Sequence, residues 1–291
     1  MSESEGITET AEEIKTGDSD NSVRQQSNPY YFPQDALYKG PVLNGVRIVD
    51  CPVSDDSLTH MKKIRNLSMR NNDMIIAAYP KCGTHWVAEI VHMLLTGSAE
   101  YSARSKEHAM LEFIPDLSAL DQMTSPRLFN SHLCMAHLPA QIVEKNVKII
   151  HLIRNPKDTA VSFYHDMRQG YDAEKFTFDN FLKGYTTEGY MGFPAQFDYL
   201  RQMTQFERDN PGHSIMHIHY EDLKKTPVPI IQELAEYIGV TVGREFCQDV
   251  ATACCFEQLK KASDDRDLPE NLATFNLTSI YRKGGYINPW T

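Results

Sequence analysis

Short apolar runs alternate along the chain with segments that repeat apolar residues at helical spacing. Residues 74–79 form a continuous apolar run, Pro80-Lys-Cys-Gly interrupts it, and apolar residues then recur from Trp86 to Leu95, before Gly97. A buried strand reads as a short apolar run, whereas an amphipathic helix repeats apolar residues every three or four positions. The pattern therefore predicts a strand, a tight loop and a helix.

The same alternation continues further along the chain. We predict a strand, the loop Arg154-Asn-Pro-Lys-Asp and a helix with Asp158 as its N-cap. The further predicted elements are strands over 127–132, 147–153 and 214–219 and helices over 194–210 and 227–238. Such alternation typically builds a parallel sheet with helices on both faces and ligands at the carboxyl ends of the strands. We expect a single α/β domain with a central, mostly parallel sheet flanked by helices, and a P-loop-like phosphate-binding strand, loop and helix.

Charge and composition narrow the possible classes of protein. The chain has 291 residues, of which 41% are hydrophobic, and a formal net charge of −10. This charge would repel a phosphate backbone, so nucleic acid is not an expected partner. The apolar runs fall short of the roughly 20 residues that a membrane helix needs, and the sequence opens without a secretory signal pattern. We expect a cytoplasmic protein with no membrane partner.

Residues 1–28 differ from the rest of the chain. They are rich in Ser, Thr and acidic residues and poor in large apolar residues, so they cannot offset the entropy cost of ordering. We predict an acidic disordered tail over 1–28 and one domain over 29–291. The six cysteines include no CxxC pair and no zinc-site spacing, so we expect free thiols.

One segment has the composition of an anion site. Tyr79-Pro-Lys-Cys-Gly-Thr-His-Trp places a lysine, a glycine and a threonine between a strand and a helix. Backbone N–H groups at a helix N-terminus point at an anion, the glycine permits close approach, and Lys81 adds a positive charge. The GxxxxGK[ST] spacing of a Walker A loop is absent. An ordinary turn with a solvated lysine has the same spacing, so spacing alone leaves both interpretations open.

A second candidate anion site follows the next predicted strand. Arg154 ends this strand and Ser162 lies in the following helix. The planar fork of an arginine side chain matches phosphate oxygens. An arginine followed by Asn-Pro is by itself more often a surface turn, but two such loops in one chain favour phosphate binding.

These segments resemble the cytosolic sulfotransferases. The loop from Tyr79 is similar to that family's 5′-phosphosulfate loop, usually Tyr-Pro-Lys-Ser-Gly-Thr-Thr-Trp. The segments that resemble the 3′-phosphate segment are Arg154-Asn-Pro-Lys-Asp and Ala160-Val-Ser-Phe-Tyr-His. Further matches are Pro126-Arg-Leu-Phe-Asn-Ser-His-Leu to the catalytic strand, Tyr220-Glu-Asp-Leu to the core strand that follows, and Arg282-Lys-Gly to the C-terminal phosphate loop. The similarity runs from about Pro29 to Gly284 in the family's order.

The resemblance implies a donor, 3′-phosphoadenosine 5′-phosphosulfate (PAPS), and a small-molecule acceptor with a hydroxyl or amine. The residues implied for the 5′-phosphosulfate are Lys81, Cys82, Gly83, Thr84 and His85. Those implied for the 3′-phosphate are Arg154, Ser162, Arg282, Lys283 and Gly284. Those implied for the nucleoside are Trp86 and Phe256 beside the adenine and Tyr220 with its hydroxyl toward the nucleotide. Considered alone, Trp86 and Phe256 would equally be core aromatics.

The resemblance also implies His132 as the general base. An imidazole pKa near 6.5 allows a histidine to accept a hydroxyl proton at neutral pH, and only the family motif distinguishes His132 from His137 or His151. Lys81 is expected to neutralise the charge on the leaving oxygen. No metal is expected: His217 and His219 share one strand face, but no Cys or carboxylate joins them at ligand spacing.

Asn130-Ser131-His132 departs from the family's usual Lys-Thr-His. A neutral amide at Asn130 replaces a cation beside the transferred sulfuryl group, a difference of about 1–2 kcal/mol that corresponds to a rate lower by roughly 5- to 30-fold. Replacing Asn130 with lysine is therefore expected to raise kcat. The family's short dimerisation motif is also absent, which leaves the oligomeric state open.

The acceptor is not specified by any polar motif. The segments 30–38, 111–117 and 184–193 are rich in apolar and aromatic residues, which favours a flat, apolar acceptor. Two other classes compete with the active enzyme: a relative that binds the nucleotide without catalysis, and a nucleotide kinase with a divergent phosphate loop. The missing Walker A residues and the candidate 3′-phosphate residues count against the kinase.

Overall fold

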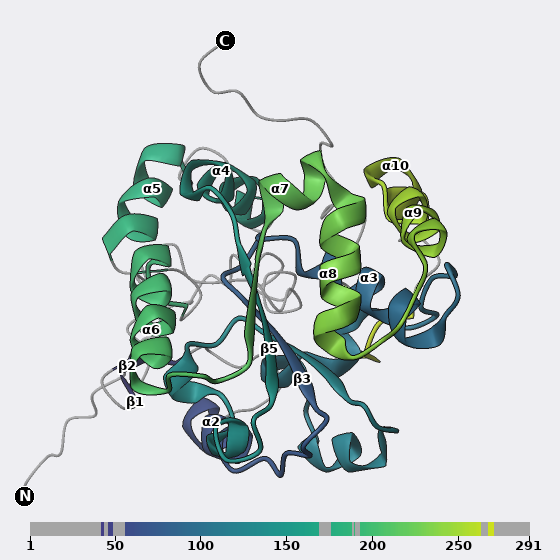
Figure 1. Ribbon diagram of the computed structural model, residues 1–291. Coiled ribbons are helices and arrows are strands. Elements are labelled where there is room, and N and C mark those ends of the chain that lie inside the picture. Colours follow the sequence, from purple (N-terminus) through teal and green to yellow (C-terminus); the bar gives the residue numbers. More distant parts are fainter. Residues whose placement is uncertain are drawn as a thin grey trace, which may run out of the picture.

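The computed structural model describes residues 42–43, 46–48, 56–168, 176–187, 189, 193–262 and 267–270 (Figure 1). Several predictions fall on other parts of the chain. The acidic tail over 1–28, the candidate acceptor segment over 30–38 and the phosphate ligands Arg282, Lys283 and Gly284 all lie outside the described residues.

A four-stranded parallel sheet forms the centre of the described structure. Its strands are β3 (Met74–Ala78), β4 (Leu128–Ser131), β5 (Lys148–Ile153) and β6 (Ile215–His219), in the order β4-β3-β5-β6. In β3, Ile76 lies opposite Asn130 of β4 and Ile150 of β5. Every residue of β3 is buried, because a central parallel strand is covered on both faces. All four strand predictions are confirmed. Two short strands, β1 (Val42–Leu43) and β2 (Val46–Arg47), pair separately and antiparallel.

Helices flank both sides of this sheet, as Figure 1 shows. One group contains α3 (Thr84–Thr96), α8 (Pro227–Ile238), α9 (Arg244–Ala253) and α10 (Phe256–Ala262). The other contains α4 (Pro156–Met167), α5 (Phe178–Thr187) and α6 (Gln196–Asp209), while α2 (Ser57–Arg65) lies near the amino ends of the strands and α7 (Tyr220–Lys225) follows β6 directly. Short 3₁₀ helices occupy Lys106–Ala109, Leu111–Phe113, Leu117–Gln122, Met135–His137 and Ala140–Ile142. The predicted α/β class with a parallel sheet is confirmed.

The helix after the first strand begins and ends at glycines. Gly83 precedes α3 with φ 101° and Gly97 follows it with φ 67°, both in the left-handed region that glycine adopts without steric cost. Between them, Val87, Ile90 and Leu94 are buried against the sheet. The predicted strand, loop and helix are therefore all present.

The prediction of a strand from Tyr220 is wrong. Strand β6 ends at His219, and Tyr220 is the first residue of α7. The charges of this segment suit a helix: the acidic residues Glu221 and Asp222 lie in its first turn, and the basic residues Lys224 and Lys225 lie in its last. These charges complement the helix dipole. Tyr220 therefore sits at a strand-to-helix junction.

The predicted N-cap of α4 is also wrong. Asn155, rather than Asp158, caps this helix, and its side-chain oxygen accepts a hydrogen bond from the Lys157 N–H at 2.9 Å. Pro156 occupies the first turn, where its missing N–H is not needed. The helix consequently begins at Pro156, three residues earlier than a cap at Asp158 would allow.

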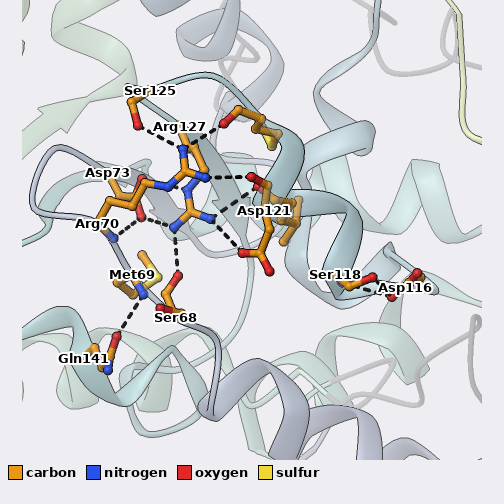
Figure 2. Close-up of polar contacts among 12 residues, drawn as sticks. Ser68, Met69, Arg70, Asp73, Asp116, Ser118, Asp121, Ser125, Arg127 and Gln141 are labelled. Atoms are coloured by element: carbon orange, nitrogen blue, oxygen red, sulfur yellow. Dashed lines mark hydrogen bonds and ion pairs between the residues drawn. The ribbon is translucent and has the colours of Figure 1, made fainter.

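A buried ion pair joins the amino ends of β3 and β4 (Figure 2). The fully buried Arg127 side chain donates from Nε to Asp73 Oδ1 at 2.9 Å and from Nη2 to the Ser68 carbonyl oxygen at 2.8 Å. Asp73 also accepts from the Arg70 N–H at 2.7 Å, and the Met74 N–H donates to the Arg127 carbonyl oxygen. These bonds satisfy both buried charges, so the pair fixes the alignment of β3 with β4.

Removing one partner of this pair should destabilise the protein strongly. We expect Asp73→Ala to lower the free energy of unfolding by about 3–5 kcal/mol, because it removes the buried counter-charge of Arg127 and leaves only the longer contact, at 3.7 Å, to the exposed Asp121 carboxylate. The exposed pair Glu144–Lys145 is the control, and Glu144→Ala should change stability by less than about 1 kcal/mol. Urea unfolding followed by circular dichroism measures both, and equal effects would contradict the assigned role.

Candidate active site

The loop between β3 and α3 has the backbone geometry of an anion site. Lys81 has φ 69° and Gly83 has φ 101°, so the chain turns sharply into the helix. Gly83 occupies the N-cap position of α3 and has no side chain with which to cap the helix. A helix N-terminus without a cap presents N–H groups and a partial positive charge to a ligand. The loop predicted from the sequence is therefore arranged to bind an anion.

The ammonium group of Lys81 is held by an acidic residue from another helix. Its Nζ lies 2.9 Å from Asp166 Oδ1 of α4, and the lysine side chain is 12% exposed. The Lys81 carbonyl oxygen in turn accepts a hydrogen bond from Arg154 Nη1 at 2.8 Å. Sequence reasoning did not identify Asp166, because no spacing links it to a loop so far away in the chain.

Arg154, Tyr220, Trp86 and Gly83 meet beside this loop. The Arg154 guanidinium lies 4.3 Å from the centroid of the Tyr220 ring, and Trp86 packs edge-on against that ring at 5.5 Å. A Cβ added at Gly83 would lie 2.9 Å from Tyr220 Cδ2. Arg154 Nε is buried and has no partner among the described residues. Four of the predicted nucleotide-binding residues are thus brought together.

The other predicted loop and nucleoside residues occupy less diagnostic positions. Ser162 is partly buried on α4, and Phe256 is the partly buried first residue of α10. Thr84 is buried at the start of α3. Cys82 is buried against Thr159, and burial raises the pKa of its thiol to about 12. A thiol that stays protonated does not act as a nucleophile. The described cysteines are all free thiols: Cys82, Cys134, Cys247, Cys254 and Cys255.

His132 lies directly after β4, with its ring fixed by the neighbouring strand. Its Nδ1 is 2.7 Å from the carbonyl oxygen of Ala78, the last residue of β3. Its backbone N–H donates to Glu112 Oε1 at 2.6 Å, and Ser131 Oγ donates to the other oxygen of the same carboxylate at 3.0 Å. Burial, followed by the positive charge of Lys106, lowers the pKa of His132 to about 3. The imidazole is therefore neutral at physiological pH.

A cluster of buried polar side chains lies next to His132. Lys106 Nζ is 3.2 Å from Glu107 Oε1, and His85 Nε2 is 2.7 Å from the same oxygen. The lysine and glutamate side chains are each only 4% exposed. Burial is the main cause that lowers the pKa of His85 to about 4, so this ring is also neutral. The cluster supplies a buried cation close to the predicted base.

Asn130 completes this neighbourhood from β4. Its side chain is 2% exposed, and its Oδ1 has no hydrogen-bond partner in the described part of the chain. Its backbone bridges Met110, whose Sδ is 3.5 Å from Lys106 Nζ. Met110 therefore links the Asn130 backbone to the Lys106 ammonium group. Sequence reasoning missed Lys106, Glu107 and Glu112, because they lie in a segment of 3₁₀ turns without periodicity.

Two predicted acceptor segments contact this region. Residues 111–113 form a buried 3₁₀ helix that carries Glu112, the partner of the His132 backbone. Phe193 packs edge-on against the His132 ring at 5.8 Å. The site as a whole combines a candidate anion-binding loop, a partly buried arginine and a neutral histidine near the carboxyl ends of parallel strands. An α/β protein of this class binds its ligands at this edge of the sheet.

Comparison with known proteins identifies the family. A family model described as the sulfotransferase domain matches residues 71–286. Sulfotransferase 1B1 of Canis lupus familiaris is 31% identical over 265 residues, which cover 87% of this chain and 87% of that protein. The chain therefore belongs to the sulfotransferase family, and it is a PAPS-dependent sulfotransferase. These matches confirm the resemblance to the sulfotransferases and the donor, PAPS, that this resemblance implied.

Solved structures share the fold. The crystal structure of mouse sulfotransferase SULT7A1 complexed with PAP superposes with a TM-score of 0.64 at 23% identity, over 84% of this chain and 85% of that chain. Retinol dehydratase in complex with androsterone and inactive cofactor PAP has a TM-score of 0.59 at 19% identity, over 74% and 71%. Among the residues that the structure describes, none of the helices has the length and apolar character needed to cross a membrane.

A side chain at Gly83 should disrupt the site. We expect Gly83→Ala to lower the free energy of unfolding by about 1–3 kcal/mol through its positive φ, with a further loss from the clash with Tyr220. Gly212 is a matched control, because it has φ 89° and open space around its Cβ position. Urea unfolding followed by tryptophan fluorescence compares the two variants. A smaller loss for Gly83→Ala than for Gly212→Ala would contradict close packing against Tyr220.

Proposed function

We propose that this enzyme transfers the sulfuryl group of PAPS to a hydroxyl or amine of a small acceptor, with His132 as the general base. The observation that carries this proposal is the 2.7 Å contact between His132 Nδ1 and the Ala78 carbonyl oxygen. A carbonyl oxygen only accepts, so Nδ1 holds the proton and Nε2 keeps its lone pair. Because Ala78 ends β3, the base lies beside the strand end from which the phosphate loop starts.

The residues around the loop fit this donor. The uncapped start of α3 and the partnerless Arg154 Nε are two sites for anionic groups, and both adjoin the Lys81 backbone. We assign the 5′-phosphosulfate to Lys81, Cys82, Gly83, Thr84 and His85. We assign the 3′-phosphate to Arg154 and Ser162, with Arg282, Lys283 and Gly284 as further ligands predicted from the motif. Trp86, Tyr220 and Phe256 are assigned to the nucleoside. When bound, PAPS supplies an activated sulfuryl group.

The side chains of this chain then have separate roles. His132 Nε2 accepts the proton of the acceptor hydroxyl or amine as the new bond to sulfur forms. The Lys81 ammonium stabilises the negative charge on the oxygen that leaves. Glu112 holds the backbone of His132, and the Ala78 carbonyl holds its ring, so the base is oriented before the acceptor arrives.

Lys106 supplies the positive charge that Asn130 lacks. After burial, its ammonium group, which is paired with Glu107, is a further cause of the lowered pKa of both His132 and His85. We propose that this charge stabilises the anionic groups of the transition state in place of the family's usual lysine. With Lys106 in this role, a lysine at position 130 would add a second ammonium group to the same region. We therefore do not expect Asn130→Lys alone to raise kcat.

An apolar acceptor suits the surroundings of His132. Phe193 contacts the imidazole, and the 3₁₀ segment that carries Glu112 also contributes the buried side chains of Leu111 and Phe113. The androsterone bound in the retinol dehydratase complex supports an acceptor of this kind. We also propose a cytoplasmic location, in keeping with the resemblance to cytosolic sulfotransferases.

Replacing His132 tests the proposed base. We expect His132→Ala to lower kcat by about 10²–10⁴-fold and to leave the affinity for the nucleotide nearly unchanged. The assay measures transfer of label from PAPS to a panel of phenols, sterols and aliphatic alcohols.

The pH profile of the wild-type enzyme tests the same base. Because the pKa of His132 is lowered, the base stays unprotonated well into the acid range. The acid limb of kcat/KM for the wild-type enzyme should therefore lie below pH 6.5, the ordinary value for histidine.

Two results would contradict this assignment. One is a His132→Ala variant that keeps a tenth or more of wild-type kcat. The other is a wild-type protein that is stabilised by the nucleotide in a thermal melt but transfers no label to any acceptor, which would indicate a catalytically silent binder.

Replacing Lys106 tests the relocated charge. We expect Lys106→Met to lower kcat roughly 5- to 30-fold and to move the acid limb of kcat/KM upward, because its charge lowers the pKa of His132. Adding Asn130→Lys to Lys106→Met should restore part of the lost kcat, whereas Asn130→Lys alone should not raise it. Donor-dependent thermal stabilisation confirms folding in each variant. An unchanged kcat and acid limb in Lys106→Met would refute this role.

A further inference from the structure

A second cluster of polar side chains lies on the sheet away from the phosphate loop. His151 of β5 and His217 of β6 face each other in register, with their Nδ1 atoms 3.0 Å apart. Glu207 of α6 lies over them, and its Oε1 is 3.3 Å from His217 Nε2. One ligand atom from each of the three residues lies within 4.8 Å of the other two. Two imidazoles and a carboxylate thus converge from three elements.

We propose that His151, Glu207 and His217 bind a divalent transition metal, with Zn²⁺ as the preferred ion. Two histidines and a glutamate are a known ligand set for Zn²⁺, with water in the fourth position. Bonds of about 2.0–2.1 Å in tetrahedral geometry place ligand atoms about 3.3 Å apart, close to the spacing of the two Nδ1 atoms. Because Glu207 Oε1 lies against Nε2 of His217, its side chain has to turn toward Nδ1 for the three ligands to share one ion.

The surroundings of the cluster favour binding. His151 is buried, with 2% of the residue exposed, and it lies opposite His217 in the ladder between β5 and β6, so its ring is held in a fixed place beside the other ligands. The side chains of His217 and Glu207 are 38% and 36% exposed, which gives an ion access from solvent and lets the carboxylate turn. His151 also packs against Tyr199, which keeps its ring in place.

The expectation of no metal rested on the spacing of the cysteines and of His217 and His219 along the sequence. A carboxylate does join His217, but it comes from α6, and the second histidine comes from β5 rather than from the same strand. An ion held here would tie α6 and the outer strand β6 to β5. Since β6 leads directly into Tyr220, the ion would stabilise the support of the nucleotide-binding residues without taking part in the reaction.

Metal titration of the full-length chain, stripped with a chelator, tests the proposal. We expect Zn²⁺ to bind the wild-type protein at this site and raise its Tm, and Co²⁺ to produce visible absorption bands of tetrahedral coordination. His217→Ala and Glu207→Gln should each weaken the binding about tenfold or more. Both residues are partly exposed, so both variants should fold. His219→Ala is the matched control, because it lies on the same strand face outside the ligand set.

The alternative is a chain of hydrogen bonds from Glu207 through His217 to His151 without any ion. It is the correct interpretation if Zn²⁺ leaves the Tm unchanged, or if His217→Ala binds the ion as tightly as the wild-type protein. An equal loss in His219→Ala and His217→Ala would also overturn the proposed ligand set. None of these readouts depends on sulfuryl transfer, so they stand apart from the test of the proposed function.

Discussion

The chemistry of this protein depends on the burial of β3 between β4 and β5. The backbone at the end of this strand anchors functional side chains from both neighbours: the Ala78 carbonyl oxygen accepts from His132, and the Lys81 carbonyl oxygen accepts from Arg154. Ala78 pairs with Leu152 of β5, so its carbonyl cannot shift without disturbing that ladder. The base and the arginine are therefore fixed relative to the loop that lies between them. At the other end of β3, the ion pair of Asp73 with Arg127 secures the same alignment.

The elements that position the site could be predicted because their sequences repeat or run apolar. β3 is covered on both faces, so each of its positions is apolar, and α3 places Val87, Ile90 and Leu94 on one face. The glycines at 83 and 97 mark the two ends of that helix for the same steric reason. Once strand ends are known, a parallel sheet brings their loops to one edge, which is why Lys81 and Arg154 could be assigned to one ligand.

The parts that sequence reasoning missed have no such signal. Lys106, Glu107 and Glu112 lie in short 3₁₀ turns, where polar residues normally indicate exposure, yet they are buried around His132. Their burial follows from contacts with β4 that only the tertiary structure creates. The prediction for the segment from Tyr220 failed for a different reason: the family motif was matched to a core strand, but it gave no information on where β6 ends. Local charge pattern, which favours a helix there, was the better guide.

The ion pair between Lys81 and Asp166 has a consequence for how the enzyme recognises an anion. The ammonium group meets its carboxylate partner at 2.9 Å, so a phosphosulfate that binds Lys81 has to displace a carboxylate of its own sign. Under the proposed function, binding at this loop is an exchange of counter-ions, and its free energy is the difference between the attraction of Lys81 to the ligand and its attraction to Asp166. A weakly charged molecule would not displace the carboxylate, so the loop would favour ligands with dense negative charge. The same exchange would free the Asp166 carboxylate of α4.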